Sequence, residues 1–271
     1  MTEHGVVIIT GGNRGIGLAT AELLAAEGIE IALVARRRER GEEALARLGG
    51  RAELVVGDLS DRAGTTALAD ELKERFPDVR ALVHNAGIWP HRRVLNADGF
   101  EQAYFTNHLA PFLLGHLLEE RLKESAATVV QVSAGLYVKG KVDPERTPTG
   151  ADFHAIRTYA DTKLANLMMV PLFAERWKDA GVTVNALHPG VIRTGLGDRR
   201  GPLGLLLKAV KRTWQPPEEG GRPVARLVTA PPGTSGAYFD VDKETPLERP
   251  ALDAALARRL WDDASAALDV S

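Results

Sequence analysis

Tyr159 precedes Lys163 by four residues in a segment of helical periodicity, residues 156–178. Side chains four apart on a helix share a face, so the sequence predicts a phenol beside an ammonium. A free phenol has a pKa of about 10, and a cation about 4 Å away at an effective dielectric of about 20 would favour its ionised form by roughly 4 kcal/mol, or about three pKa units. The pair therefore predicts proton exchange near neutral pH. A tyrosine packed on a lysine stem is the alternative.

A glycine-rich turn, TGGNRGIG at residues 10–17, follows an apolar run and opens a helical segment. Backbone N–H groups at a helix N-terminus bind a pyrophosphate closely only where no Cβ intervenes, which is the role proposed for Gly11, Gly15 and Gly17. The spacing differs from G-x-G-x-x-G, and the missing Gly-Lys-Ser/Thr ending argues against a triphosphate-binding loop. A tight strand-to-helix connection is the other interpretation.

The second apolar run ends in LVARRR, where a dinucleotide-binding fold selects its cofactor. An acid about 20 residues beyond the glycines binds a free ribose hydroxyl, whereas arginine accommodates a 2′-phosphate. The acid is missing here, and Arg36 and Arg14 offer two guanidinium groups to that phosphate. We therefore expect NADP(H) in preference to NAD(H). Arg37 and Arg38 fit a solvated helix start.

The elements that must position these residues alternate between short β-branched runs and longer helical segments. The runs expected to be strands are residues 5–10, 29–34, 52–57, 79–85, 127–133, 182–189 and 235–241. The segments expected to be helices are residues 15–27, 38–48, 61–75, 99–123, 156–178 and 218–229, followed by a terminal helix. The strands are almost wholly apolar, as strands covered by helices on both faces are. With right-handed crossovers, this predicts an α/β fold: a Rossmann-type, doubly wound parallel sheet of about seven strands in a single domain.

Within this domain, residues 1–190 are expected to form the cofactor-binding and catalytic core, and residues 191–271 a substrate-covering segment with the last strand and the C-terminal helix. A boundary near residue 190 between two domains is the alternative. The net charge of −2 and the lack of long basic runs exclude bulk attraction to nucleic acid or an anionic membrane. Without cysteine, a membrane-length apolar run or a secretion signal, we expect a soluble, cytoplasmic protein with no metal site.

Taken in order, seven motifs resemble those of the short-chain dehydrogenase/reductases: TGGNRGIG, GDLS, HNAG, TNHLAPFLL, VVQVSAG, YADTK and HPGVIRT. Within that family the chain is similar to retinol-dehydrogenase-like and carbonyl-reductase-like members. SGAYFDVD and LARRLWDDAS near the C-terminus favour the retinol-dehydrogenase-like branch. The resemblance implies an NADP(H)-dependent oxidoreductase that interconverts a small-molecule carbonyl and an alcohol by hydride transfer.

The same resemblance implies four catalytic residues. Tyr159 gives the proton in carbonyl reduction and takes it in alcohol oxidation, and Lys163 lowers its pKa and holds the nicotinamide ribose. Ser133 hydrogen-bonds the substrate oxygen and stabilises the developing oxyanion. Asn107 positions a water that feeds protons to Lys163. Because Pro111 lacks an N–H group, the Asn107 carbonyl loses its usual helix partner and is expected to be free to bind that water, a simple kink being the alternative.

Further cofactor contacts are implied by the resemblance. Asp58 is similar to the acid at the adenine amino group, residues 85–87 to the turn at the adenosine ribose, and residues 189–191 to the nicotinamide platform. The carboxamide contact falls on Thr194. The full cofactor-binding set comprises Gly11, Asn13, Arg14, Gly15, Ile16, Gly17, Arg36, Asp58, Leu59, Asn85, Ala86, Gly87, Tyr159, Lys163, Pro189, Gly190, Val191 and Thr194.

The chain also departs from the commonest family members. His84 replaces an asparagine and is expected to be packed rather than catalytic. Ser133 and Tyr159 lie about twice as far apart as is common, and we interpret residues 140–153 between them as a loop at the mouth of the site. Pro171 interrupts the Tyr159 helix and is expected to bend its far end, which leaves a homo-oligomer and a monomer both open.

The substrate is predicted only as a class. An apolar pocket is expected from Trp89, Leu136, Tyr137, Leu196 and residues 203–210, which favours a lipophilic or aromatic molecule. The alternative is that these residues pack the core. Two rival functions stay open: an extended-family nucleotide-sugar epimerase or dehydratase, for which the chain is short, and a non-catalytic NADP(H)-binding regulator, against which the intact catalytic set argues.

Overall fold

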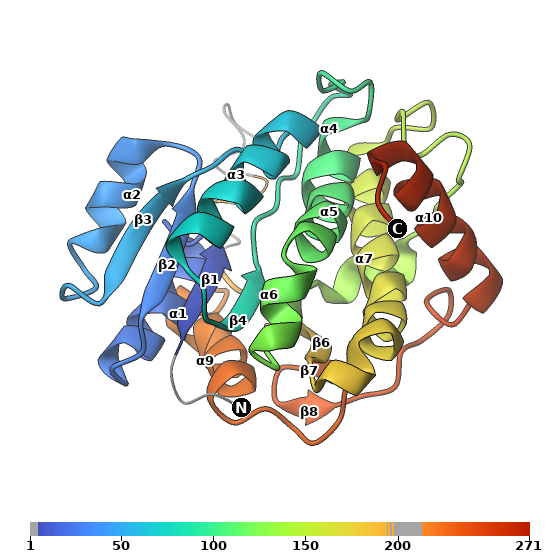
Figure 1. Ribbon diagram of the computed structural model, residues 1–271. Coiled ribbons are helices and arrows are strands. Elements are labelled where there is room, and N and C mark those ends of the chain that lie inside the picture. Colours follow the sequence, from blue (N-terminus) through green and yellow to red (C-terminus); the bar gives the residue numbers. More distant parts are fainter. Residues whose placement is uncertain (1–4, 194, 196, 198–212) are drawn as a thin grey trace.

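The computed structural model describes residues 5–193, 195, 197 and 213–271. Thr194, Leu196 and residues 203–210, which the sequence singled out, lie outside these residues. The described chain forms a sheet with helices on both faces (Figure 1), which confirms the α/β, doubly wound architecture predicted from the apolar strands. No helix in this part of the chain combines the length and apolarity needed to cross a bilayer.

The sheet has eight strands in the order β3-β2-β1-β4-β5-β6-β7-β8. Neighbouring strands from β3 to β7 are parallel, and the short β8 pairs antiparallel with β7. In the register, Ile8 of β1 lies beside Ala32 of β2 on one side and Leu82 of β4 on the other. The strands are β1 (Val6–Thr10), β2 (Ile31–Ala35), β3 (Ala52–Val56), β4 (Val79–His84), β5 (Thr128–Val132), β6 (Thr183–His188), β7 (Tyr238–Asp240) and β8 (Lys243–Glu244).

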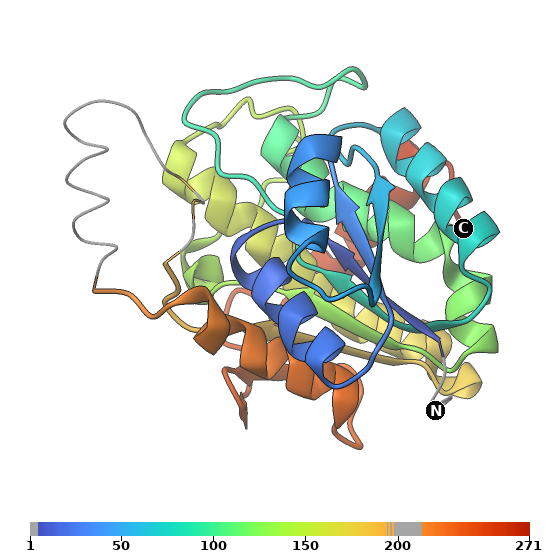
Figure 2. The same cartoon turned by 90° about the vertical axis from the view of Figure 1, so that its left-hand side faces the viewer.

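Helices cover both faces of this sheet (Figure 2). The α-helices of the described chain are α1 (Gly15–Ala26), α2 (Arg38–Leu45), α3 (Arg62–Arg75), α4 (Gln102–Tyr104), α5 (Ala110–Leu117), α6 (Glu119–Glu124), α7 (Ala155–Trp177), α9 (Pro217–Thr229) and α10 (Ala254–Leu268). Val7 and Ile9 of β1 pack in one apolar cluster with α1, α2 and α9, while Val6 and Ile8 pack in another with α3, α5 and α7. Alternate side chains of a strand point to opposite faces, so an all-apolar strand supplies both clusters at once.

The chain after residue 190 belongs to the same domain. β7 extends the sheet beside β6, α9 packs against α1, and α10 packs against α7. Trp261 of α10 contacts the rings of Phe112 in α5 and Phe173 in α7, at centroid distances of 4.9 and 4.7 Å. A separate domain beginning near residue 190 is therefore excluded by the continuous sheet.

The helix predicted over residues 99–123 is divided. A π-helical turn, Phe105–Leu109, separates α4 from α5, and the Ala110 N–H donates to the Phe105 carbonyl five residues earlier. Pro111, near the start of α5, has no N–H with which to continue the α-helical ladder. Such π turns inside helices are frequent at functional sites, and this one contains Asn107. Pro171, by contrast, lies inside α7, which continues to Trp177.

Candidate active site

The glycine turn after β1 depends on glycine at three positions. Gly11 and Gly15 have φ values of +63° and +57°, in the left-handed region that side chains disfavour. A Cβ atom on Gly11 would lie 2.9 Å from the Ala86 Cα. On Gly17 it would collide with the Asn85 amide and lie 2.8 Å from the Gly11 carbonyl oxygen. The turn thus approaches the loop after β4 so closely that side chains are excluded.

Hydrogen bonds join these two loops. The Asn85 side-chain amide donates to the carbonyls of Thr10 and Gly11, at 2.9 and 3.1 Å. The Thr10 hydroxyl accepts from the backbone N–H groups of Asn85 and Ala86 and donates to the Val83 carbonyl. Because the strand order reverses between β1 and β4, the loops meet at the switch point where open α/β sheets bind nucleotides. Thr10 organises this junction and was not predicted from the sequence.

The entrance to α1 is suited to an anion. Arg14 is the N-cap residue, its side chain makes no capping bond, and the first turn carries no acidic residue. Arg14 and Arg36 are both exposed, and neither takes part in an ion pair with another described residue. Helix N-termini attract negative charge, and guanidinium groups bind phosphate. These features, with the Cβ-free turn, fit the phosphate groups of a dinucleotide.

The predicted adenine contacts lie beyond β3. Asp58 is exposed, and its Oδ1 accepts a hydrogen bond from the Ser60 N–H at 3.0 Å, while Leu59 is buried. After β6, at the same end of the sheet but beyond β1 and β4 in the strand order, Gly190 has a φ of +90° and Val191 is 56% exposed. Exposed Asp58 and Val191 are accessible to a ligand, as the predicted contacts require.

Tyr159 and Lys163 are both buried on α7, with 6% and 5% of their surfaces exposed. The Lys163 Nζ donates to the Val132 carbonyl at 3.0 Å and lies 5.8 Å from the centroid of the Tyr159 ring. Burial lowers the pKa of the Lys163 ammonium to about 8. Burial also raises the pKa of the Tyr159 phenol, opposite to the direction predicted from the spacing. The prediction from the spacing did not include desolvation, which disfavours an ionised phenol.

Ser133 follows Val132, the residue whose carbonyl accepts the Lys163 hydrogen bond. Its backbone N–H donates to the Leu187 carbonyl at 2.8 Å, and the residue is 4% exposed. Its hydroxyl makes no hydrogen bond to any other described residue. A buried hydroxyl without a partner is uncommon in folded proteins and calls for an explanation. A ligand oxygen would supply the missing partner, whereas a hydroxyl that caps the strand end would already have one.

Asn107 holds two neighbouring segments. Its side chain pairs with Ile88, accepting from the Ile88 N–H at 2.8 Å and donating to the Ile88 carbonyl at 2.9 Å, and it also donates to the Thr162 hydroxyl at 3.1 Å. The backbone carbonyl that Pro111 leaves without its helix partner accepts a hydrogen bond from the Asn166 side chain at 2.5 Å. The expectation that this carbonyl is free is therefore wrong. Asn166 was not predicted because it lies on a different helix, α7.

Gly87 brings three of these segments together. A Cβ atom on Gly87 would lie 3.4 Å from the Asn107 Oδ1 and 3.9 Å from the Lys163 Nζ. The loop after β4, the π-helical turn and α7 therefore converge at one place, at the end of β5 where Val132 binds Lys163. Asn107 and Lys163, predicted from separate motifs, lie next to one another across this glycine.

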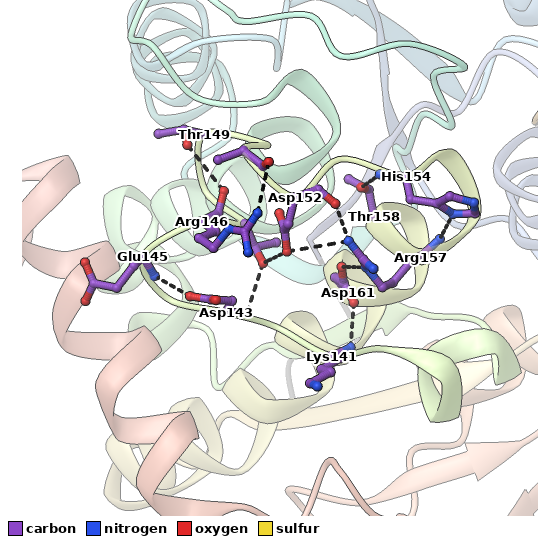
Figure 3. Close-up of polar contacts among 12 residues, drawn as sticks. Lys141, Asp143, Glu145, Arg146, Thr149, Asp152, His154, Arg157, Thr158 and Asp161 are labelled. Atoms are coloured by element: carbon purple, nitrogen blue, oxygen red, sulfur yellow. Dashed lines mark hydrogen bonds and ion pairs between the residues drawn. The ribbon is translucent and has the colours of Figure 1, made fainter.

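Residues 140–153 fold against the start of α7 (Figure 3). The Asp161 carboxylate accepts from the Lys141 N–H at 2.6 Å, and Arg157 donates to the Asp152 carbonyl. Between these two contacts, Glu145 forms a 2.6 Å ion pair with Arg259 of α10. Burial raises the pKa of Asp161 to about 6. The loop is thus tied to α7 and α10, and its effect on substrate access stays a prediction.

Two of the residues expected to line an apolar pocket, Trp89 and Tyr137, lie in different surroundings. Trp89 stacks on Tyr159, with ring centroids 4.5 Å apart. Tyr137 instead packs in the core: it is 3% exposed, its ring contacts Tyr238, and its hydroxyl accepts from the Glu248 N–H at 3.0 Å. The expectation that Tyr137 lines the pocket is therefore wrong.

His84 is buried at the end of β4, where burial lowers the pKa of its imidazole to about 4, so it is a neutral, packed side chain as predicted. Among the residues that the structure describes, no three His, Asp or Glu side chains gather as a metal site would require.

Comparisons with known proteins agree with this arrangement. Residues 5–202 match the family model described as short chain dehydrogenase. Human retinol dehydrogenase 14 is 35% identical, over 96% of this chain and 85% of its own length. The protein named "Putative daunorubicin C-13 ketoreductase DnrU" of Streptomyces sp. (strain C5) is 32% identical, over 98% of this chain and 95% of its own. Among solved structures, a blue fluorescent protein from a metagenomic library, in complex with NADPH, is 26% identical with a TM-score of 0.68, over 88% of this chain and 96% of that one.

Proposed function

The chain belongs to the short-chain dehydrogenase family, and from this premise we propose that it is an NADP(H)-dependent carbonyl reductase, reversible as an alcohol dehydrogenase. The observation that carries the proposal is the buried, unpartnered Ser133 hydroxyl beside the residue that binds Lys163. This hydroxyl is free to donate a hydrogen bond to a ligand oxygen at the end of β5, where Lys163 is also held.

Each catalytic side chain has a distinct role in the proposed reaction. During reduction the Tyr159 hydroxyl gives its proton to the carbonyl oxygen. During oxidation the Tyr159 oxygen, having first lost its proton to the neutral Lys163 amine, takes the proton of the alcohol. The Ser133 hydroxyl donates a hydrogen bond to the same oxygen as negative charge develops on it. When bound, the nicotinamide supplies the hydride in reduction and accepts it in oxidation.

Lys163 replaces the proton that Tyr159 gives. With a pKa of about 8, its ammonium is mostly protonated at neutral pH yet can release a proton. The raised pKa of Tyr159 keeps the phenol protonated, as an acid that donates to a carbonyl must be. In this proposal Lys163 is the group whose pKa lies near neutral pH, and it returns a proton to Tyr159 after the phenol has acted as the acid.

The preference for NADP(H) is supported by Arg14 and Arg36. Both are exposed, and neither is neutralised by a described acidic side chain. The NADPH bound to the metagenomic structural neighbour is in keeping with this choice. We assign the 2′-phosphate to these two arginines, the pyrophosphate to the N-terminus of α1, and the adenine amino group to Asp58.

The proposed substrate is a lipophilic or aromatic carbonyl compound or the corresponding alcohol. The Tyr159 phenol lies against the Trp89 indole, so the reacting group is bordered by an aromatic surface. The relatives' names describe an alcohol dehydrogenase and a ketone reductase, which are the two directions of one reaction.

A carbonyl screen tests the proposal. Purified protein is mixed with NADPH or NADH and a panel of aromatic ketones, aliphatic aldehydes and small polar carbonyls, with NADP⁺ and the matching alcohols in parallel. We expect carbonyl-dependent NADPH oxidation that is greatest with the aromatic and lipophilic members. Tight NADPH binding without turnover of any compound would contradict catalysis and favour a cofactor-binding regulator.

A further inference from the structure

The Trp89 indole makes two contacts with one turn of α7. Its ring stacks on the Tyr159 ring, with centroids 4.5 Å apart and planes inclined by 11°. Its Nε1 donates to the Ala155 carbonyl at 2.7 Å. Ala155 lies four residues before Tyr159, on the same face of the helix. The indole therefore spans the turn that carries the catalytic phenol.

The backbone that carries Trp89 is itself held. The preceding residue, Ile88, exchanges two hydrogen bonds with the Asn107 side chain. A Cβ atom on Gly197 would lie 3.1 Å from the Trp89 Cε3, so the chain after β6 also contacts the indole. A continuous series of contacts thus runs from Asn107 through Ile88 and Trp89 to Tyr159.

We propose that Trp89 is a positioning residue for Tyr159, fixing the plane of the phenol for proton transfer. The inference rests on the proposed function of the same site. A phenol is free to turn about χ1 and χ2 unless neighbouring groups hold it, and stacked aromatic rings attract one another. The hydrogen bond to Ala155 aligns the indole with the helix, and the stacked ring surface itself holds the phenol. Proton transfer needs its donor within hydrogen-bond reach of the substrate oxygen, so loss of the stack misplaces the reacting atom.

This role differs from packing in the core and from gating. Trp89 is partly exposed, whereas Tyr159, on whose ring it stacks, is 6% exposed, so Trp89 is not a fully buried core residue. A residue that merely filled the core would change stability without a selective change in turnover. A gate that blocked the substrate would raise turnover when removed. A positioning residue lowers it.

Three variants separate these roles. Trp89→Leu removes the stack and the N–H donor, and Trp89→Phe keeps an aromatic ring but loses the donor. Trp261→Leu is the matched control, because Trp261 packs on Phe112 and Phe173 under α10, away from the catalytic residues. For each protein kcat, KM, the NADPH dissociation constant and the melting temperature are measured with a carbonyl substrate from the screen.

We expect Trp89→Leu to lower kcat by about tenfold to a hundredfold, the cost of a misplaced reacting group. NADPH affinity should stay within about twofold, since no phosphate contact is assigned to this residue. Trp89→Phe should recover most of the lost kcat, and Trp261→Leu should leave kcat unchanged. An unchanged or increased kcat for Trp89→Leu overturns the proposal, as does a Trp89→Phe variant as slow as the leucine variant.

A spectroscopic measurement decides the question without turnover. The chain has four tyrosines, so labelling their Cζ atoms with ¹³C gives four resonances, and Tyr159→Phe identifies the one from Tyr159. Loss of the indole should shift and broaden that resonance selectively in Trp89→Leu, while Trp89→Phe retains one sharp line. A sharp, unmoved Tyr159 resonance in Trp89→Leu overturns the proposal. If the wild-type protein reduces no carbonyl, the proposed function fails, and the resonance still reports whether Trp89 holds the phenol.

Discussion

Replacement of Arg36 by aspartate should reverse the cofactor preference. Arg36 follows the last residue of β2, is exposed, and forms no ion pair with a described residue. Its charge is therefore available to a 2′-phosphate, and an aspartate there would repel that phosphate and accept a hydrogen bond from the free ribose hydroxyl.

The magnitude follows from the exposure of the site. A charge-assisted hydrogen bond contributes about 1.5–3 kcal/mol, and solvent screening at an exposed position favours the lower end. The new carboxylate about 4 Å from the phosphate adds about 1 kcal/mol of repulsion in water. The sum of about 2.5 kcal/mol corresponds to a loss of somewhat less than a hundredfold in NADPH affinity. Since both charges are exposed, the loss should shrink at high ionic strength.

The assay is a titration of each protein with NADPH and NADH, followed by calorimetry or cofactor fluorescence. The wild type should bind NADPH at least about tenfold more tightly than NADH, and Arg36→Asp should favour NADH. Arg38→Gln is the control, since Arg38 begins α2 and is assigned no phosphate contact. Equal affinities of the wild type for the two cofactors, or an unchanged ratio in Arg36→Asp, would refute the reasoning.

Two further substitutions test the packing of the site. Gly17→Ala should lower the free energy of unfolding by about 1–3 kcal/mol and weaken NADPH binding. The added methyl group would collide with the Asn85 amide and break its two hydrogen bonds to the glycine turn. Urea unfolding and NADPH titration measure the two effects, and wild-type values in both would count against the close approach of the loops. The pKa of Asp161 is raised to about 6, so the folded state favours the protonated carboxyl. The free energy of unfolding of the wild type should therefore fall as the pH rises from about 4 to about 6, by at most about 1.4 kcal/mol per pH unit. Asp161→Asn should lack that fall in urea unfolding across this range, and an identical slope in both proteins would contradict the buried, ionisable carboxyl.

Much of the fold is predictable because its central strands, β1, β2, β4, β5 and β6, are buried on both faces. Continuous apolar runs such as VVIIT indicate a parallel sheet between two helical layers, and the glycine turn indicates the end of the sheet at which a nucleotide binds. β8 was missed because Lys243–Glu244 is short and exposed and carries no apolar pattern. The division of residues 99–123 by a π-helical turn was missed because the pattern of apolar residues does not report a change in hydrogen-bond register.

The site residues that belong to sequence motifs were predictable, whereas contacts between segments distant in the sequence were not. Asn107 and Lys163 were expected near one another, but the bond from Asn166 to the Asn107 carbonyl joins residues 59 positions apart. The direction of the Tyr159 pKa was predicted wrongly because spacing gives the distance between charges and not the desolvation that opposes them. The stacking of Trp89 on Tyr159 likewise depends on the path of the loop after β4.

The central claim is that the Tyr159 hydroxyl transfers the proton in the reaction, and the most direct test is the turnover of Tyr159→Phe. This substitution removes one oxygen atom and keeps the ring that stacks on Trp89. Turnover should fall by about a hundredfold to ten-thousandfold, the usual contribution of general acid catalysis, while NADPH affinity stays within about twofold. A phenylalanine variant that reduces the same carbonyl at the wild-type rate would contradict the claim.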